Sequence, residues 1–209
     1  MPQSTATTAA GHTPTGATAA SAPLLIVPGL YDSGPGHWQS LWLETLPNAT
    51  KVEQADWQRP TLAEWVGELV DAVRRQPGAI LVGHSLGCAA IAHVAQLRSG
   101  RDIAGALLVA PAEVGRGGPV GQLLAGFGPM PLGRLPFPST VVASRDDPYV
   151  ALERSRVFAR SWGSKFIDAG DAGHINVASG HGHWPEGLSA LDDLVERVSP
   201  ATTDLLAAG

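Results

Sequence analysis

The 209-residue sequence lacks a pair of cysteines, a long apolar run and an excess of basic residues. Its one cysteine, Cys88, excludes an intramolecular disulfide, provides no C-x-x-C pair, and is compatible with a reducing cytoplasm. The formal net charge of −5 offers no basic face for nucleic acid or an anionic membrane. No segment approaches the roughly 18 consecutive apolar residues that a membrane span needs. We therefore expect a cytoplasmic protein that binds neither nucleic acid nor a membrane.

The N-terminal segment, residues 1–22, lacks both the positive n-region and the apolar h-region of a secretory signal. It consists mainly of Ala, Thr, Gly, Ser and Pro, which bury too little apolar surface to offset the entropy of ordering the chain. We expect a disordered tail here, with a cleaved targeting segment as the alternative. The remaining length suits a single folded domain over residues 23–209.

Short apolar runs alternate with helical patterns along that domain. The runs predict strands at residues 24–27, 79–82, 103–109, 139–143 and 165–168, and a weaker peripheral strand lies near 50–54. Helical spacing or capping signals predict helices near residues 38–46, 61–76, 88–98, 150–162 and 185–198. This alternation predicts an α/β fold: a doubly wound, mostly parallel sheet of about six strands with helices on both faces.

The stretch AILVGHSLG, residues 79–87, carries the first chemical signal. Here G-x-S-x-G stands between an apolar run and a helical segment, which is the setting of a nucleophile elbow. Gly83 and Gly87 leave room for the backbone to double back, and Ser85 must adopt a strained conformation. The pentapeptide alone occurs often by chance, but its flanks favour Ser85 as a nucleophile.

A serine nucleophile needs a base and an acid, which in this fold follow it along the chain. Gly173 and His174 follow the strand at 165–168, and we assign the base to His174. Asp146 and Asp147 both follow the strand at 139–143. We prefer Asp147 as the acid, expect Asp146 to cap the turn or the following helix, and regard Asp171 as a weaker rival.

The remaining histidines receive other predictions. His84 is expected to be a structural hydrogen bonder, and His181 and His183 are expected to be surface or packing residues. An H-G-H pair can bind a metal, but no cysteine or carboxylate cluster has ligand spacing around it, so we predict neither a metal site nor a cofactor.

Two backbone N–H groups are candidates for an oxyanion hole. Leu86 follows the nucleophile, and Leu30 follows Pro28 and Gly29 after the first strand; the chain has no H-G-G-G sequence of the lipase type.

Candidate pocket walls come from tryptophans in or beside loops: Trp38, Trp57 and Trp184. The Gly- and Pro-rich section at 112–138 contains too many breakers for a long helix, and a loop of that length is usually functional or disordered.

Five stretches together resemble one family. They are VPGLYDSGPGHWQSLW, DWQRPTLAEW, LVGHSLG, LPFPSTVVASRDDPYV and AGHINVASGHGHWPEG. The chain resembles the small bacterial serine hydrolases related to retinoblastoma-binding protein 9, within the α/β-hydrolase superfamily, over about residues 23–198. The resemblance implies Ser85, Asp147 and His174 as a triad in a compact hydrolase without a large helical lid. The N-terminal tail has no counterpart in that family's core.

These observations predict a metal-independent serine hydrolase that cleaves small carboxylic esters through an acyl-enzyme. Amides and thioesters are alternative substrates, and perhydrolysis or carbon–carbon bond hydrolysis can use the same triad. The competing hypothesis is a non-catalytic protein-binding scaffold on a hydrolase fold. A complete nucleophile, base and acid in the order of this fold argues for the enzyme.

Overall fold

The computed structural model describes residues 22–199, and the predicted tail lies outside this range except for Ala22. Within it, six strands form one sheet in the order β2-β1-β3-β4-β5-β6, and every neighbouring pair is parallel. The strands are β1 (Leu24–Val27), β2 (Ala49–Lys51), β3 (Ala79–His84), β4 (Ile103–Val109), β5 (Ser139–Ala143) and β6 (Lys165–Asp168). The four inner strands are buried along nearly their whole length, as their continuous apolar runs predict.

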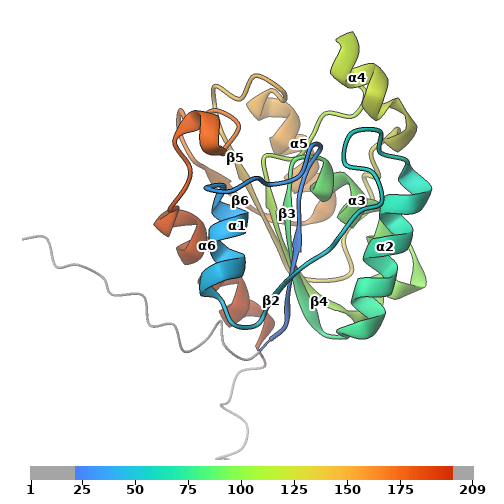
Figure 1. Cartoon of the computed structure of the whole chain (residues 1–209), viewed down its shortest axis with the longest axis vertical. Coiled ribbons are helices and arrows are strands. Elements are labelled where there is room, and N and C mark those ends of the chain that lie inside the picture. The colour runs from blue at the N-terminus through green and yellow to red at the C-terminus, as the bar shows by residue number, and fades with distance from the viewer. Residues whose placement is uncertain (1–21, 200–209) are drawn as a thin grey trace, which may run out of the picture.

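Six α-helices connect and cover these strands (Figure 1). They are α1 (Trp38–Thr45), α2 (Leu62–Arg75), α3 (Leu86–Ala95), α4 (Gly118–Leu124), α5 (Leu152–Trp162) and α6 (Pro185–Val198). Three short 3-10 helices, η1 (Arg98–Asp102), η2 (Ala125–Phe127) and η3 (Val177–Ser179), lie in connections. Among residues 22–199, no helix is long and apolar enough to cross a membrane.

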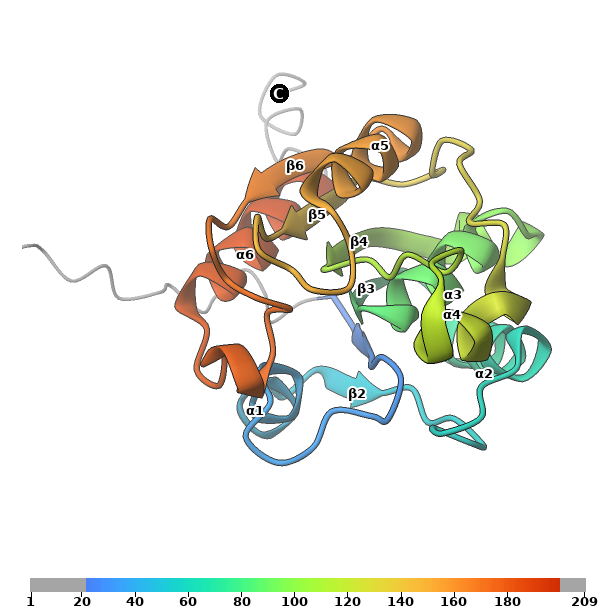
Figure 2. The ribbon, with the colours of Figure 1, turned by 90° about the horizontal axis from the view of Figure 1, so that it is seen from above.

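The sheet separates two hydrophobic clusters. Side chains of α2, α3 and α5 pack with one face, while those of α1 and α6 pack with the other. Figures 1 and 2 show the same division, with α1 and α6 on one side of the strands and α2 and α3 on the opposite side. We refer below to the α2–α3 face and the α1–α6 face.

The predicted α/β fold is confirmed, and so are its strands and main helices. The weak strand is the short edge strand β2, and the section at 112–138 holds one seven-residue helix, α4, and η2. Within the described residues no large helical lid covers the sheet. At the start of α2, Thr61 accepts a hydrogen bond from the N–H of Glu64, so this helix begins at the predicted cap.

Gly87 and Gly67 make a matched pair of helical glycines for a test of the packing. A Cβ on Gly87 would lie 2.2 Å from the carbonyl oxygen of Val27, whereas one on Gly67 in α2 would meet nothing within 4 Å. We expect Gly87→Ala to lower the free energy of unfolding by about 3 kcal/mol or to prevent folding. Gly67→Ala should raise it by about 0.5–1 kcal/mol. Urea denaturation of both variants checks this, and equal effects would contradict the structure.

Candidate active site

Ser85 occupies the turn between β3 and α3 with φ 51° and ψ −115°. A non-glycine residue rarely adopts a positive φ, and such strain is common at functional sites. The turn is tight because its glycines have close neighbours: a Cβ on Gly83 would lie 2.7 Å from Cδ1 of Ile91. The elbow predicted around G-x-S-x-G is therefore present as a backbone geometry.

A cavity of about 210 Å³ opens over Ser85. Its lining comes from segments that follow five of the strands, at residues 29–37, 84–85, 112–124, 149 and 174–176. Because all strands are parallel, these segments gather at the carboxyl edge of the sheet, where open α/β sheets bind ligands. Figure 2 looks onto the molecule from above and shows α4 in front of α3 on the α2–α3 face.

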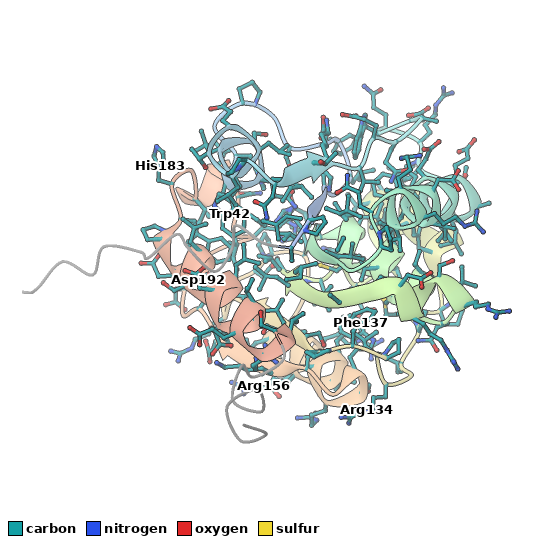
Figure 3. All side chains as sticks on the ribbon, turned by 90° about the horizontal axis from the view of Figure 1, so that it is seen from below. Trp42, Arg134, Phe137, Arg156, His183 and Asp192 are labelled. Atoms are coloured by element: carbon teal, nitrogen blue, oxygen red, sulfur yellow. The ribbon has the colours of Figure 1, made fainter. Side chains whose placement is uncertain are left out.

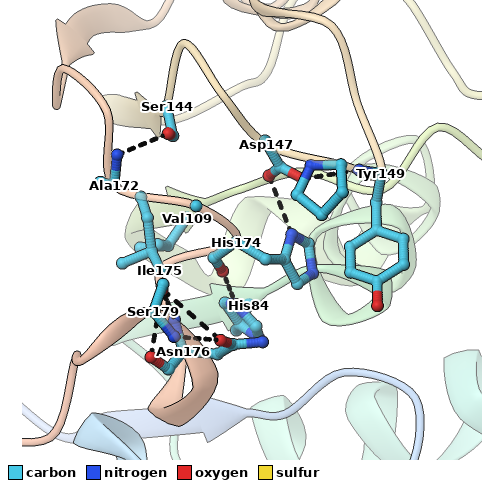
Figure 4. A network of polar contacts seen from close by, with 12 residues as sticks. His84, Val109, Ser144, Asp147, Tyr149, Ala172, His174, Ile175, Asn176 and Ser179 are labelled. Carbon is cyan, nitrogen blue, oxygen red and sulfur yellow. Dashed lines mark hydrogen bonds and ion pairs between the residues drawn. The ribbon is translucent and has the colours of Figure 1, made fainter.

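His174 lines the same cavity as Ser85 and is hydrogen-bonded to Asp147 (Figure 4). The distance from Nδ1 of His174 to Oδ2 of Asp147 is 2.8 Å, and the Asp147 side chain is fully buried. The other oxygen of Asp147, Oδ1, accepts a hydrogen bond from the N–H of Tyr149 at 2.8 Å. Since a carboxylate only accepts, Nδ1 of His174 carries a hydrogen, and in the neutral tautomer of the ring Nε2 keeps its lone pair. Ser85 Oγ has no hydrogen-bond partner among the described residues.

Asp146 and Asp171 have different surroundings from Asp147. Oδ1 of Asp146 accepts hydrogen bonds from Ser144 Oγ at 2.6 Å and from the N–H of Gly173 at 2.7 Å. These bonds lower the pKa of Asp146 and tie the segment after β5 to the segment after β6. Asp171 is exposed. The structure thus brings Asp147, and neither rival, to the imidazole.

The backbone N–H groups of Leu30 and Leu86 are both without an acceptor within residues 22–199. Leu86 is the first residue of α3, where helical N–H groups have no partner inside the helix. The loop carrying Leu30 runs close to the elbow, since a Cβ on Gly29 would lie 2.9 Å from the Cβ of Ser85. Two free donors therefore flank the turn that carries Ser85.

Three histidine rings pack in a row beside this cavity. The ring centroids of His84 and His174 are 4.9 Å apart, and those of His37 and His84 are 5.0 Å apart. Nε2 of His84 donates to the carbonyl oxygen of His174 at 2.9 Å, in the structural role predicted for it (Figure 4). Burial, with a smaller effect of His174, lowers the pKa of His37 to about 4 and holds that of His84 well below its usual value.

The predicted tryptophan walls are wrong for this cavity. Trp38 is completely buried between helices, where its Nε1 donates to the carbonyl oxygen of Ile175, and Trp184 packs in the same cluster on the α1–α6 face. Trp57 packs against the core on the α2–α3 face and against the ring of Trp65. Trp38 and Trp184 are thus buried in the core, and Trp57 is half-buried against it.

The cavity is lined instead by residues that the sequence analysis did not propose as pocket walls: His37, Tyr149, Glu113 and Arg116. The Tyr149 ring lies 4.6 Å from the His174 ring, edge to face. The one local signal for His37 is its position next to Trp38, directly before a helix. No local sequence pattern marks Tyr149, Glu113 or Arg116.

His181 and His183 lie outside this row of three histidines. His183 is exposed and points outward from the edge of the molecule, while Trp42 lies in the interior (Figure 3). His181 is hydrogen-bonded to Ser179. Among residues 22–199, no group of three His, Cys, Asp or Glu side chains is arranged to hold a metal ion.

The pKa of His37 makes the folding stability depend on pH. The unfolded chain binds a proton at this residue below about pH 6.5, but the folded protein does not until about pH 4. Stability contributed by neutral His37 is therefore present above pH 6.5 and is lost as the pH falls toward 4, by up to about 3 kcal/mol. We expect His37→Asn, which keeps a helix-capping side chain, to reduce this loss in urea titrations between pH 7 and 4. The exposed His183→Asn serves as the control, and an unchanged pH profile in His37→Asn would contradict the assignment.

Known proteins with similar sequence or structure indicate the family and the fold. A sequence model described as Serine hydrolase matches residues 24–193. A solved structure described as a YdeN-like hydrolase from Pectobacterium atrosepticum is 34% identical, with a TM-score of 0.76 over 88% of this chain and 95% of the other. The ydeN gene product of Bacillus subtilis is 22% identical, with a TM-score of 0.68 over 84% and 100%.

An esterase from a Rhodococcus species shares the fold at 15% identity, with a TM-score of 0.63 over 87% of this chain and 92% of the other. No protein with a curated description matches the chain in sequence. The family match covers most of the chain and contains the elbow, the cavity and the His174–Asp147 pair. The chain therefore belongs to the serine hydrolase family, and it is an enzyme of the α/β-hydrolase type.

Proposed function

We propose that Ser85, His174 and Asp147 are a catalytic triad that hydrolyses small carboxylic esters through an acyl-enzyme. The observation that carries the proposal is the 2.8 Å hydrogen bond from His174 to a fully buried carboxylate, in a cavity that Ser85 also lines. Serine is a weak nucleophile unless a neighbouring base accepts its proton. Asp147 fixes the tautomer in which Nε2 of His174 can be that base.

The first half-reaction forms the acyl-enzyme. Ser85 Oγ attacks the ester carbonyl carbon as its proton passes to Nε2 of His174, and the carbonyl electron pair moves onto oxygen. The free N–H groups of Leu30 and Leu86 donate to that oxyanion. The tetrahedral intermediate then collapses: the bond to the leaving oxygen breaks, and that oxygen takes the proton from Nε2.

Water completes the cycle. It gives a proton to Nε2 of His174, attacks the acyl carbon, and releases the acid as Ser85 recovers its proton. Asp147 stabilises the imidazolium in both half-reactions without being protonated itself. Two hydrogen bonds hold this carboxylate, from His174 and from the N–H of Tyr149, so it is fixed in position throughout.

The size of the cavity and the absence of a large lid among the described residues support the proposed substrate class. A volume of about 210 Å³ suits a small acyl group, with the rest of the substrate extending past Tyr31 and Tyr149 at the rim, which are both exposed. The resemblance to hydrolases related to retinoblastoma-binding protein 9 supports the same triad residue by residue. Esters are the proposed substrates, and amides and thioesters follow the same chemistry.

A fluorophosphonate probe tests the nucleophile. We expect wild-type protein to be labelled covalently and Ser85→Ala to be unlabelled, because the probe reacts with an activated serine oxygen. Intact-mass measurement gives the stoichiometry, and digestion with peptide mapping gives the residue. Absence of labelling in the wild type, or equal labelling of Ser85→Ala, would refute the proposal.

The two neighbouring aspartates allow a matched test of the acid. Asp147→Asn should lower kcat on a small ester by about 10³–10⁴-fold, because the amide no longer holds the reactive tautomer of His174. Asp146→Asn keeps an acceptor oxygen for Ser144 and Gly173, so we expect less than about a tenfold loss. Steady-state kinetics on both variants decides the matter. A crippled Asp146→Asn beside an active Asp147→Asn would reverse the assignment.

A further inference from the structure

His37 lines the cavity beside Ser85 but has no part in the triad. It is the N-cap of α1, and its Nδ1 accepts a hydrogen bond from the N–H of Gln39 at 3.1 Å. An imidazole nitrogen that accepts has no hydrogen, so a neutral His37 carries its hydrogen on Nε2. The burial described above keeps this ring neutral at neutral pH.

The Nε2 atom of His37 has no acceptor among the described residues and is not completely enclosed by protein atoms, and His37 is one of the residues that line the cavity. An unpaired donor in a largely buried side chain is unfavourable unless water or a ligand satisfies it. Only 6% of the His37 surface is exposed, so the donor has little access to bulk solvent. A molecule bound in the cavity that His37 lines can supply this acceptor.

The ring is held firmly in this place. Gln39, two residues on, is fully buried and donates from Nε2 to the carbonyl oxygens of Val82 at 3.0 Å and Val27 at 3.4 Å. These bonds fix the first turn of α1 to the ends of β3 and β1. The His37 ring also packs against the rings of Trp38 and His84. Its donor is preorganised rather than brought in by a mobile loop.

The side of the cavity on which His37 lies indicates which substrate atom it meets. The oxyanion donors belong to the α2–α3 face, because Leu86 is part of that hydrophobic cluster and Leu30 packs against it. His37 precedes Trp38 of the α1–α6 cluster and shares the His84 ring as a neighbour with His174. With the carbonyl oxygen turned to the α2–α3 face, the leaving group is directed to the side of His174 and His37.

We propose that His37 is a further catalytic residue, whose Nε2–H donates a hydrogen bond to the leaving oxygen of the ester. This rests on the triad proposed above. As the carbon–oxygen bond breaks, its electron pair goes to the leaving oxygen, which takes the proton from Nε2 of His174. His37 stabilises the charge that develops on this oxygen and keeps its own proton.

Two substitutions distinguish the hydrogen-bond donor role of His37 from its role as the N-cap of α1. His37→Asn retains an acceptor near the position of Nδ1 and suits an N-cap, but it lacks a donor at the position of Nε2. His37→Gln places an amide N–H near the position of Nε2 and loses the cap. A catalytic donor thus predicts activity in His37→Gln, whereas a purely structural cap predicts it in His37→Asn.

The two variants are assayed for kcat/KM on the ethyl and p-nitrophenyl esters of the same small acid. Alkoxide needs stabilisation far more than p-nitrophenolate, in which the charge is delocalised. We expect His37→Asn to lose about 10- to 100-fold on the ethyl ester and less than about threefold on the p-nitrophenyl ester. His37→Gln should recover most of the ethyl-ester activity. The exposed His183→Asn is the control and should match wild type.

The experiments distinguish failure of the His37 proposal from failure of the triad proposal. Equal losses on both esters, wild-type rates in His37→Asn, or a His37→Gln variant as impaired as His37→Asn would overturn the role of His37. Failure of the fluorophosphonate probe to label wild-type protein would overturn the triad and this assignment together. Labelling of wild type at Ser85 with any of the first three results would overturn the role of His37 alone.

Discussion

The site depends on the contact between the end of β1 and the turn that carries Ser85. The two backbones approach so closely that a Cβ on Gly87 would lie 2.2 Å from Val27 O and 2.7 Å from Pro28 O, and one on Gly29 would meet the Cβ of Ser85 at 2.9 Å. Only glycine permits this approach. The same contact brings the loop that carries Leu30 close to the turn that precedes Leu86, so one packing constraint builds both the elbow and its two free N–H donors.

The parallel sheet then divides the chemistry between its two faces. Free backbone donors lie toward the α2–α3 face, and the row of histidines lies toward the α1–α6 face. Asp147 reaches the row from the segment after β5, held by its hydrogen bonds to His174 and Tyr149. The segments that carry these groups follow the carboxyl ends of parallel strands, which gathers them at one edge of the sheet.

The sequence predicted the parts whose signals are local. The apolar runs located the strands, and G-x-S-x-G with its flanks located the elbow at Ser85. The pocket walls failed because burial of a large ring depends on distant partners: Trp38 donates to the carbonyl of Ile175, 137 residues away along the chain. His37 was missed for a related reason. Histidine is not among the preferred N-cap residues, and its neighbours in space, His84 and His174, are distant in sequence.

His37 and His84 are both neutral, which explains why a row of three histidines can serve one base at His174. A positive charge on His37 or His84 would repel the imidazolium that forms on His174 in the proposed mechanism. Burial lowers the pKa of both side chains, and hydrogen bonds to Gln39 N and His174 O fix a neutral tautomer in each. His174 alone has a buried carboxylate as partner, because Asp147 contacts its Nδ1. Asp147 therefore stabilises the positive charge that develops on His174 in the proposed mechanism. His37 and His84 stay neutral and act as hydrogen-bonding groups.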